Sequence, residues 1–222
     1  MNLGSITRFL APHKTIPVTP WRAEHRWQLN YSRVAILFFG LAIFGLGDSL
    51  LIQGSIGNAP WTVFAEGVSI KSGWSIGFST FIISIFVLLL WIPLRERPGF
   101  GTLSNIAIIA TFIEIGTTIF PEQENYLSGV AFSLLGIALV GIGSALYITC
   151  GLGPGPRDGA MTGIHARTGI RVSRVRLGIE STVLAAGYLL GGTLGLGTLL
   201  FALLIGESVA ISLGILARLT AQ

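Results

Sequence analysis

Six long apolar segments constrain this chain more than any other feature of its sequence. A helix needs about 20 mostly apolar residues to cross a bilayer, because the hydrocarbon core is about 30 Å thick and each residue rises about 1.5 Å. The segments are Val34 to Gln53, Trp74 to Leu94, Thr102 to Phe120, Gly129 to Cys150, Val172 to Gly192 and Thr198 to Leu216. Only 11% of the 222 residues are charged, against about 25% in soluble domains. The sequence therefore predicts an all-α, polytopic membrane protein of about six transmembrane helices, embedded in the lipid bilayer.

The basic residues set the expected orientation. Cytoplasmic loops of membrane proteins collect Lys and Arg. With the N-terminus inside, one set of basic residues falls on the cytoplasmic side of a six-span chain: Arg8, Lys14, Arg22, Arg26, Arg33, Arg95, Arg97, Arg157, Arg167, Arg171, Arg174, Arg176 and Arg218. Only Lys71 falls outside. We therefore expect both termini in the cytoplasm, and the net charge of +4 reflects topology rather than nucleic-acid binding.

The first 33 residues differ from the rest of the chain. They are polar and basic, contain Pro12, Pro17 and Pro20, and have too little apolar length for a secretory signal. We expect residues 1–33 to form a cytoplasmic arm that is mobile or lies on the surface. The rest of the chain is expected to form one compact membrane domain, with a first repeat at 34–120 and a second at 129–216.

The membrane part contains an internal repeat at a constant offset of 96 positions. The matching pairs include Gly40 with Gly136, Gly45 with Gly141, Gly47 with Gly143, Gly57 with Gly153, Pro60 with Pro156 and Gly73 with Gly169. Each half holds three predicted spans, and an odd number makes the second half enter the membrane from the opposite side. The sequence thus predicts two inverted three-helix repeats, as in many transporters, whose substrate site lies near the midplane at the repeat interface.

A glycine- and proline-containing interruption follows the first span of each half. Proline suits the first position of a helix, where its missing N–H is not needed, so we expect short half-helices from Trp61 to Ser69 and from Arg157 to Arg167. Helix N-termini carry unpaired N–H groups that favour anions. Asn58, Gly153 and Gly155, which precede the two half-helices, are therefore candidate substrate-binding residues. Two surface loops with ordinary helix-breaking residues are the alternative.

Charged residues concentrate in the second half. Their positions are Arg157, Asp158, Arg176 and Glu180, and their repeat partners Trp61, Thr62, Thr80 and Ser84 carry no charge. Because ionisable groups in a bilayer are usually paired or functional, this set is a candidate for substrate binding or gating. A structural role is the alternative: Asp158 would cap its helix, and Arg157 with Glu180, or Asp158 with Arg176, would form a salt bridge between loop and span.

Three further acids lie within apolar runs: Asp48, Glu114 and Glu207. Burial favours the neutral form of a carboxyl group, so each is a candidate for proton coupling, or is simply protonated and hydrogen-bonded between helices. Cys150 has no partner cysteine, and His165 has no second histidine nearby. We therefore expect no metal site and no cofactor. Since no nucleophile with a neighbouring base is found, we expect that the protein is not an enzyme.

Two motifs resemble those of a known family. Residues 151–159 read Gly-Leu-Gly-Pro-Gly-Pro-Arg-Asp-Gly, and residues 191–198 read Gly-Gly-Thr-Leu-Gly-Leu-Gly-Thr. With Arg176 and Glu180 between them, they resemble the YczE/YyaS/YitT group of small bacterial membrane proteins, over roughly residues 34–216. One departure is Gly206-Glu207, where the group leads us to expect Gly-Pro. The resemblance implies a bacterial cytoplasmic (inner) membrane and a transporter-like role, and it names no substrate.

The sequence therefore favours a small secondary transporter or channel-like permease. Its substrate would be a small anionic or zwitterionic solute, bound between the half-helix ends. A non-transporting membrane factor that binds or assembles a partner protein is the alternative. A homo-oligomer is compatible with either.

Overall fold

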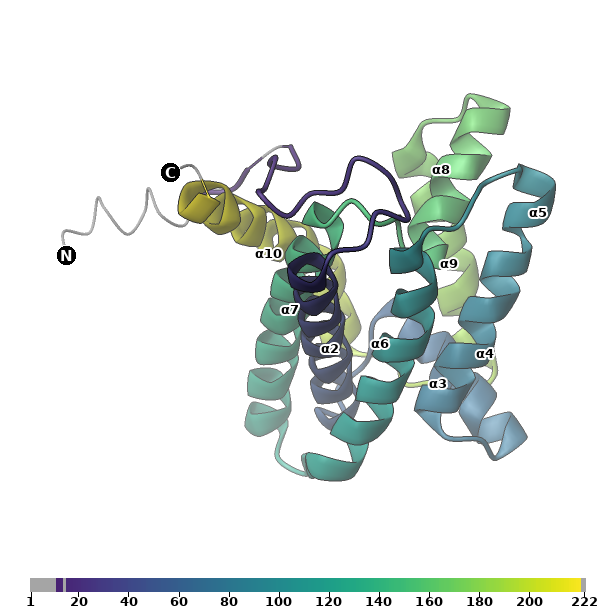
Figure 1. Ribbon diagram of the computed structural model, residues 1–222. Coiled ribbons are helices and arrows are strands. Elements are labelled where there is room, and N and C mark those ends of the chain that lie inside the picture. The colour runs from purple at the N-terminus through teal and green to yellow at the C-terminus, as the bar shows by residue number, and fades with distance from the viewer. Residues whose placement is uncertain (1–10, 14, 221–222) are drawn as a thin grey trace, which may run out of the picture.

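The computed structural model describes residues 11–13 and 15–220, so Arg8 and Lys14 lie outside the described part. Within it the fold is all-helical and contains no strand (Figure 1). The helices are α2 (Tyr31–Gln53), α3 (Pro60–Ser72), α4 (Ile76–Leu89), α5 (Trp91–Leu94), α6 (Phe100–Ile119), α7 (Tyr126–Thr149), α8 (Pro156–Thr168), α9 (Val172–Leu189) and α10 (Leu196–Thr220).

In the described part, five helices are long and apolar enough to cross a membrane: Tyr31–Gln53, Ile76–Leu94, Phe100–Ile119, Tyr126–Thr149 and Leu196–Thr220. Each overlaps one of the six predicted spans. The remaining prediction, Val172 to Gly192, corresponds to α9. This helix has 18 residues and includes three charged ones, Arg174, Arg176 and Glu180, which make it too polar to join the other five. The sixth span stays a prediction.

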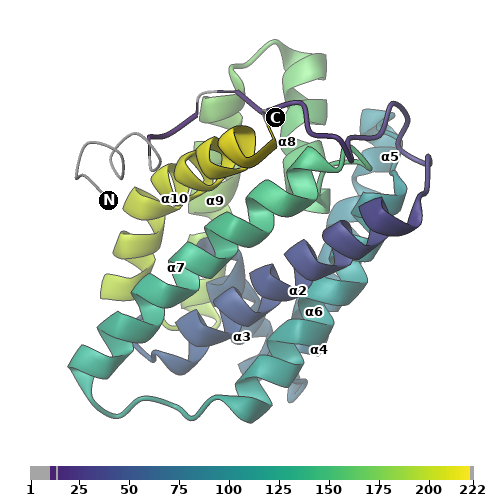
Figure 2. The same ribbon diagram turned by 60° about the vertical axis from the view of Figure 1, so that its left-hand side comes forward.

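Helices α2 and α7 form the centre of one layer and run antiparallel, side by side (Figure 2). Glycines line their contact. A Cβ on Gly143 would lie 2.5 Å from the carbonyl oxygen of Gly40, and a Cβ on Gly129 would lie 2.5 Å from that of Gly54. Small residues of this kind let membrane helices approach closely. Helix α6 packs on α2, and α10 packs on α7.

The other helices form a second group around a separate apolar cluster, which includes Trp61, Ala65, Ile83, Trp91 and Ala160. Here α3 packs on α9 and on α4, and α8 packs on α4, α5 and α9. The groups are joined chiefly where α4 packs on α6. Helix α9 packs on α3 and α8 rather than on α10, and Figure 1 shows α10 leaning away from it.

The short helices α3 and α8 have the same length of 13 residues and the same ends. Each begins at a proline, Pro60 or Pro156, which supplies a helical φ without needing a hydrogen bond. Each ends before a glycine in the left-handed region, Gly73 at φ 76° and Gly169 at φ 70°, as helix C-termini commonly do. The predicted ranges Trp61 to Ser69 and Arg157 to Arg167 lie inside these helices.

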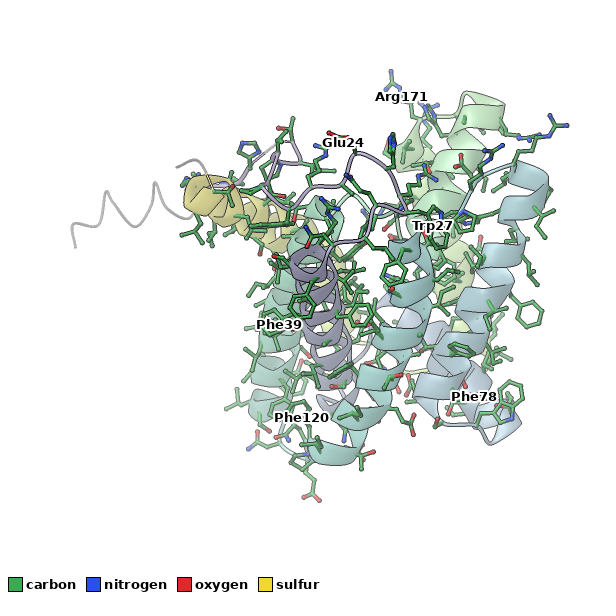
Figure 3. All side chains as sticks on the ribbon, viewed as in Figure 1. Glu24, Trp27, Phe39, Phe78, Phe120 and Arg171 are labelled. Atoms are coloured by element: carbon green, nitrogen blue, oxygen red, sulfur yellow. The ribbon has the colours of Figure 1, made fainter. Side chains whose placement is uncertain are left out.

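The described part of the arm lies across one end of the bundle. The indole N–H of Trp21 donates to Thr149 Oγ1 at 3.2 Å, and the Ala23 N–H donates to the Cys150 carbonyl at 2.9 Å. In Figure 3, Glu24 in the arm and Arg171 before α9 lie at the same end, and Phe120 after α6 lies at the opposite end. The arm and the basic α8–α9 connection therefore share one side of the molecule.

Candidate functional site

The beginnings of α3 and α8 meet at a polar cavity of about 380 Å³. Ala59 and Pro60 line it from one helix, and Gly155 and Pro156 line it from the other. Residues of α2, α4, α6, α7, α9 and α10 complete its wall. Pockets that bind small molecules generally have volumes of about 300 to 1,000 Å³, so the cavity is large enough for a small solute.

Most of the predicted site residues line this cavity. They are Asp48, Gly155, Arg157, Asp158, Arg176 and Glu180. The charged members come from three elements, α2, α8 and α9, and the helices bring them together although they lie far apart in the sequence. The tertiary structure thus gathers both signs of charge around a single space.

Two of these charged groups have no ionic partner. Arg157 makes no hydrogen bond or salt bridge within the described residues, and its Cζ lies 4.9 Å from the centre of the Trp61 ring. Asp48 is 2% exposed, and no described residue donates a hydrogen bond to it. Both residues line the same cavity, and no salt bridge within the described part neutralises either group. A cation and an acid are therefore both available to a ligand.

The other two acids have defined partners. Tyr147 Oη donates to Asp158 Oδ2 at 3.0 Å, so Asp158 accepts from α7 and makes no capping bond at the start of α8. Arg176 Nε donates to Glu180 Oε1 at 2.9 Å. Residues four positions apart on a helix lie on one face, which explains this pairing. The structure forms neither of the alternative salt bridges, Arg157 with Glu180 or Asp158 with Arg176, so that prediction is wrong.

Several uncharged polar residues of the cavity were missed by the sequence analysis: Thr80 and Ser84 of α4, Asn105 of α6, and Ser144 and Tyr147 of α7. The hydroxyl of Thr80 is buried and has no hydrogen-bond partner in the described part. A polar side chain inside an apolar span was the available signal. It is weak by itself, because hydroxyl groups in membrane helices commonly bond to their own backbone.

Two of the predicted site residues lie in the turns before the half-helices and do not line the cavity. Asn58 is 2% exposed, and its Nδ2 donates to Glu66 Oε2 at 2.9 Å. Glu66 also accepts from the N–H of Thr193 at 2.7 Å and from its hydroxyl at 2.7 Å. Gly153 is a turn residue with φ 115°, packed against Gly99. Both residues therefore join the two repeats without lining the cavity.

Glu114 and Glu207 also do not line the cavity. Glu114 is exposed on α6 beside Gly77 of α4, and Glu207 is exposed on α10. Of the three acids predicted to couple to protons, only Asp48 lines the cavity. Proton coupling remains a prediction for each. Among the described residues, no three His, Cys, Asp or Glu side chains come together as a metal site would require.

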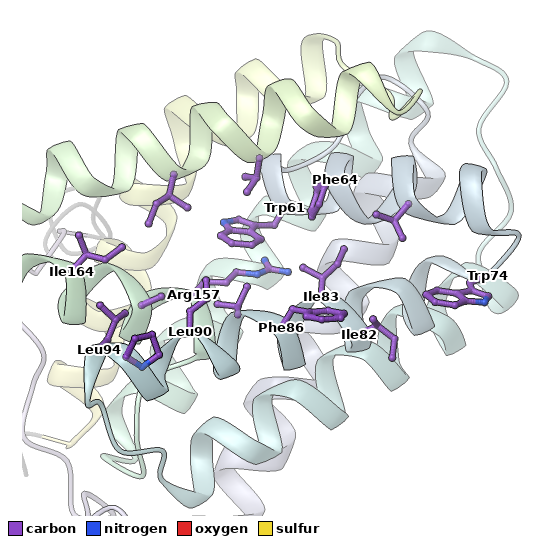
Figure 4. A pocket seen from close by; sticks show the side chains of 16 residues that line it. Trp61, Phe64, Trp74, Ile82, Ile83, Phe86, Leu90, Leu94, Arg157 and Ile164 are labelled. Atoms are coloured by element: carbon purple, nitrogen blue, oxygen red, sulfur yellow. The ribbon is translucent and has the colours of Figure 1, made fainter.

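A second, apolar groove of about 760 Å³ adjoins the cavity (Figure 4). It runs between α3, α4, α8 and α9, and its lining includes Phe64, Ile83 and Phe86. Trp61 and Arg157 line both spaces. These two side chains therefore stand between the polar cavity and the apolar groove.

Fold and cavity together define the class of this protein: an all-helical membrane protein with several apolar helices and a charged internal cavity. More particularly, the chain belongs to the family of unknown function DUF6198, whose model matches residues 31–213.

Three relatives extend this relationship. An uncharacterized protein of Haemophilus influenzae is 46% identical over 206 residues, covering 93% of this chain and 94% of the relative. The uncharacterized membrane protein YczE of Bacillus subtilis is 36% identical and covers 82% of this chain and 85% of its own length. The uncharacterized protein YyaS of Bacillus subtilis is 28% identical, and the match covers 81% of this chain and 91% of YyaS. The resemblance to the YczE and YyaS group is thereby confirmed. No solved structure matches the chain.

Proposed function

We propose that the protein is a small secondary transporter or channel-like permease, which binds an anionic or zwitterionic solute in the polar cavity. The observation that carries this proposal is the presence of Arg157 and Asp48 in one cavity, neither of them paired. Unpaired ionisable groups inside a membrane protein are costly and are usually retained for function. A solute with a carboxylate would pair with Arg157, and an ammonium group on the same solute would face Asp48.

An inverted repeat supports transport rather than simple binding. The Gly197 N–H donates to the Ile56 carbonyl at 2.8 Å, and the Gly101 N–H donates to the Leu152 carbonyl at 2.8 Å. Each residue of the first bond lies 96 positions from its counterpart in the second. The cavity lining contains pairs at the same offset: Asp48 with Ser144, Trp61 with Arg157, Thr80 with Arg176, and Ser84 with Glu180. A cavity lined by both halves of an inverted repeat is where many transporters bind their substrates.

The halves differ in a way that suits a carrier. Helix α4 packs closely on α6 in the first half, whereas its counterpart α9 makes no comparable contact with α10. Residues of both α9 and α10 line the cavity, Arg176 and Phe201 among them. In this proposal α9 is the sixth spanning helix, and movement of the α3–α9 group against the α2–α7 group opens and closes the cavity.

The proposed setting is a bacterial cytoplasmic membrane with both termini inside. The basic end of the molecule, which holds Arg171 and the arm, would face the cytoplasm. We propose that transport needs neither a cofactor nor a catalytic step.

The test is solute-dependent stabilisation of the purified protein. Thermal melting would be followed across a panel of carboxylates, amino acids and inorganic anions, for the wild type and for Arg157→Gln. At least one solute should raise the melting temperature of the wild type and have little effect on the variant. Arg174→Gln is the matched control, because Arg174 is exposed and does not line the cavity. Equal responses of Arg157→Gln and the wild type would contradict the proposal.

Uptake separates transport from binding alone. Vesicles containing the purified protein would be supplied with the stabilising solute in radiolabelled form, with and without a pH gradient. Accumulation that Arg157→Gln abolishes supports a transporter. Binding without uptake would instead favour the alternative, a membrane factor that binds or assembles a partner protein.

A further inference from the structure

The apolar groove carries a second inference, about the chemical class of the solute. Among the described residues that line the groove, Arg157 alone is charged. The other walls are aromatic and aliphatic side chains, chiefly from α3, α4, α5, α8 and α9. At its rim, Phe86 is 64% exposed and Leu90 is 57% exposed, so the groove opens on the outer surface of the helix bundle. In a bilayer that surface faces lipid.

Arg157 lies where the apolar groove meets the polar cavity. Figure 4 shows its side chain extending beside the Trp61 ring, and no described residue pairs with its guanidinium group. Trp61 is 9% exposed, and its indole N–H has no hydrogen-bond partner in the described part. A half-buried cation beside a ring whose buried N–H donor has no acceptor points to a missing negatively charged or acceptor group. That group would complete the site.

We propose that the solute is an amphiphilic anion with one aliphatic chain, drawn from the membrane. Its anionic head would pair with Arg157 and accept from Trp61, and its chain would lie in the groove against Ile83, Phe86 and Val183. This inference rests on the proposed carrier function, because the same Arg157 borders the polar cavity. Charge complementarity at the inner end, and not the apolar walls alone, distinguishes this ligand from ordinary lipid.

Chain length and charge should both control affinity. Burial of each additional methylene group strengthens binding about fourfold, so dodecanoate should bind far more tightly than butanoate. Dodecanol has the same chain without the charge and should be a poor competitor. Arg157→Gln should weaken dodecanoate binding at least about tenfold, the loss expected when a charged hydrogen-bond partner is removed.

The experiment is saturable binding of radiolabelled dodecanoate to the purified full-length protein, with unlabelled dodecanol and butanoate as competitors. Val183→Phe narrows the groove from α9 and leaves Arg157 unchanged. Ile164→Phe narrows it from α8 and serves as the second variant if Val183→Phe does not fold. Both should lose most of the binding. Leu203→Phe, on the exposed face of α10, is the matched control and should bind as the wild type does.

The outcomes separate this inference from the proposed function. If butanoate competes as well as dodecanoate in an Arg157-dependent way, and the groove variants bind normally, the amphiphile inference is overturned and the carrier proposal stands. Dodecanol competing as well as dodecanoate also overturns the inference, because the groove then holds ordinary lipid. If Arg157→Gln changes the binding of no anion, both proposals fall.

Discussion

Gly47 of α2 and Gly136 of α7 face each other across the tight contact between these two helices. A Cβ on Gly47 would lie 2.8 Å from the Gly136 oxygen, and a Cβ on Gly136 would lie 2.6 Å from the Gly47 oxygen. Any side chain here must therefore push two backbones apart. The two helices can approach this closely because both residues are glycines, which carry a hydrogen atom in place of a side chain.

This contact predicts that Gly47→Ala and Gly136→Ala each destabilise the protein. Overpacking of a tight contact costs about 1 to 3 kcal/mol, and thermal melting in detergent would measure the loss. Gly178→Ala is the control, because no atom lies within 4 Å of a Cβ at that helical position. It should be neutral or slightly stabilising. Equal stability of all three variants would contradict the account.

Glu66 predicts a second stability effect. Its carboxylate accepts two hydrogen bonds from Thr193, 127 residues later in the chain, and a third from Asn58. Glu66→Gln places an amide N–H₂ where two of the neighbours are donors, and an unsatisfied buried donor costs about 1 to 3 kcal/mol. Glu124→Gln changes the same group in an exposed loop and should leave the melting temperature unchanged. No drop for Glu66→Gln would disprove this role.

The Tyr147–Asp158 hydrogen bond predicts a change in solute binding. Tyr147→Phe removes the donor that holds the Asp158 carboxylate and keeps the ring in place. A bond to a charged group contributes about 1.5 to 3 kcal/mol, so we expect a lower melting temperature and altered affinity for the solute identified in the anion panel. Tyr188→Phe is the control, since Tyr188 is 60% exposed and lines neither cavity nor groove. If both variants bind alike, the bond does not position Asp158.

The Arg176–Glu180 pair should matter more for the solute than for stability. Its side chains are 53% and 30% exposed, and an exposed pair four residues apart on a helix contributes only about 0.5 kcal/mol. Glu180→Gln should therefore melt almost as the wild type does. Because both residues line the cavity, Glu180→Gln should weaken or strengthen solute binding by more than the about 0.5 kcal/mol that it costs in stability. A large loss of stability with unchanged affinity would assign the pair a structural role.

The proposed inversion predicts labelling from opposite sides. Lys71 and Arg167 are exposed residues in the last turns of α3 and α8, 96 positions apart. In a Cys150→Ala background, Lys71→Cys should react with a membrane-impermeant thiol reagent in intact cells. Arg167→Cys should react only after the membrane is opened. Reaction of both from the same side would rule out inverted repeats.

Much of the local structure could be predicted from the sequence. Apolar length alone indicated five helices that recur in the structure, and the positions of Pro60 and Pro156 indicated where the two short helices begin. These features depend on backbone hydrogen bonding and on neighbouring residues, which act within a few positions of the chain. The same locality explains why residues four apart, Arg176 and Glu180, were recognised as lying on one face.

Tertiary structure alone decided which polar groups meet. Asn58 and Gly153 stand in the same type of loop as Gly155, yet only Gly155 reaches the cavity, because Asn58 is held by Glu66 and Gly153 packs against Gly99 in the other half. Arg157 of α8 lines both the cavity and the groove because α3, α4 and α9 pack around the beginning of its helix. Such contacts join residues far apart in sequence, and their partners follow from how helices pack rather than from any local pattern.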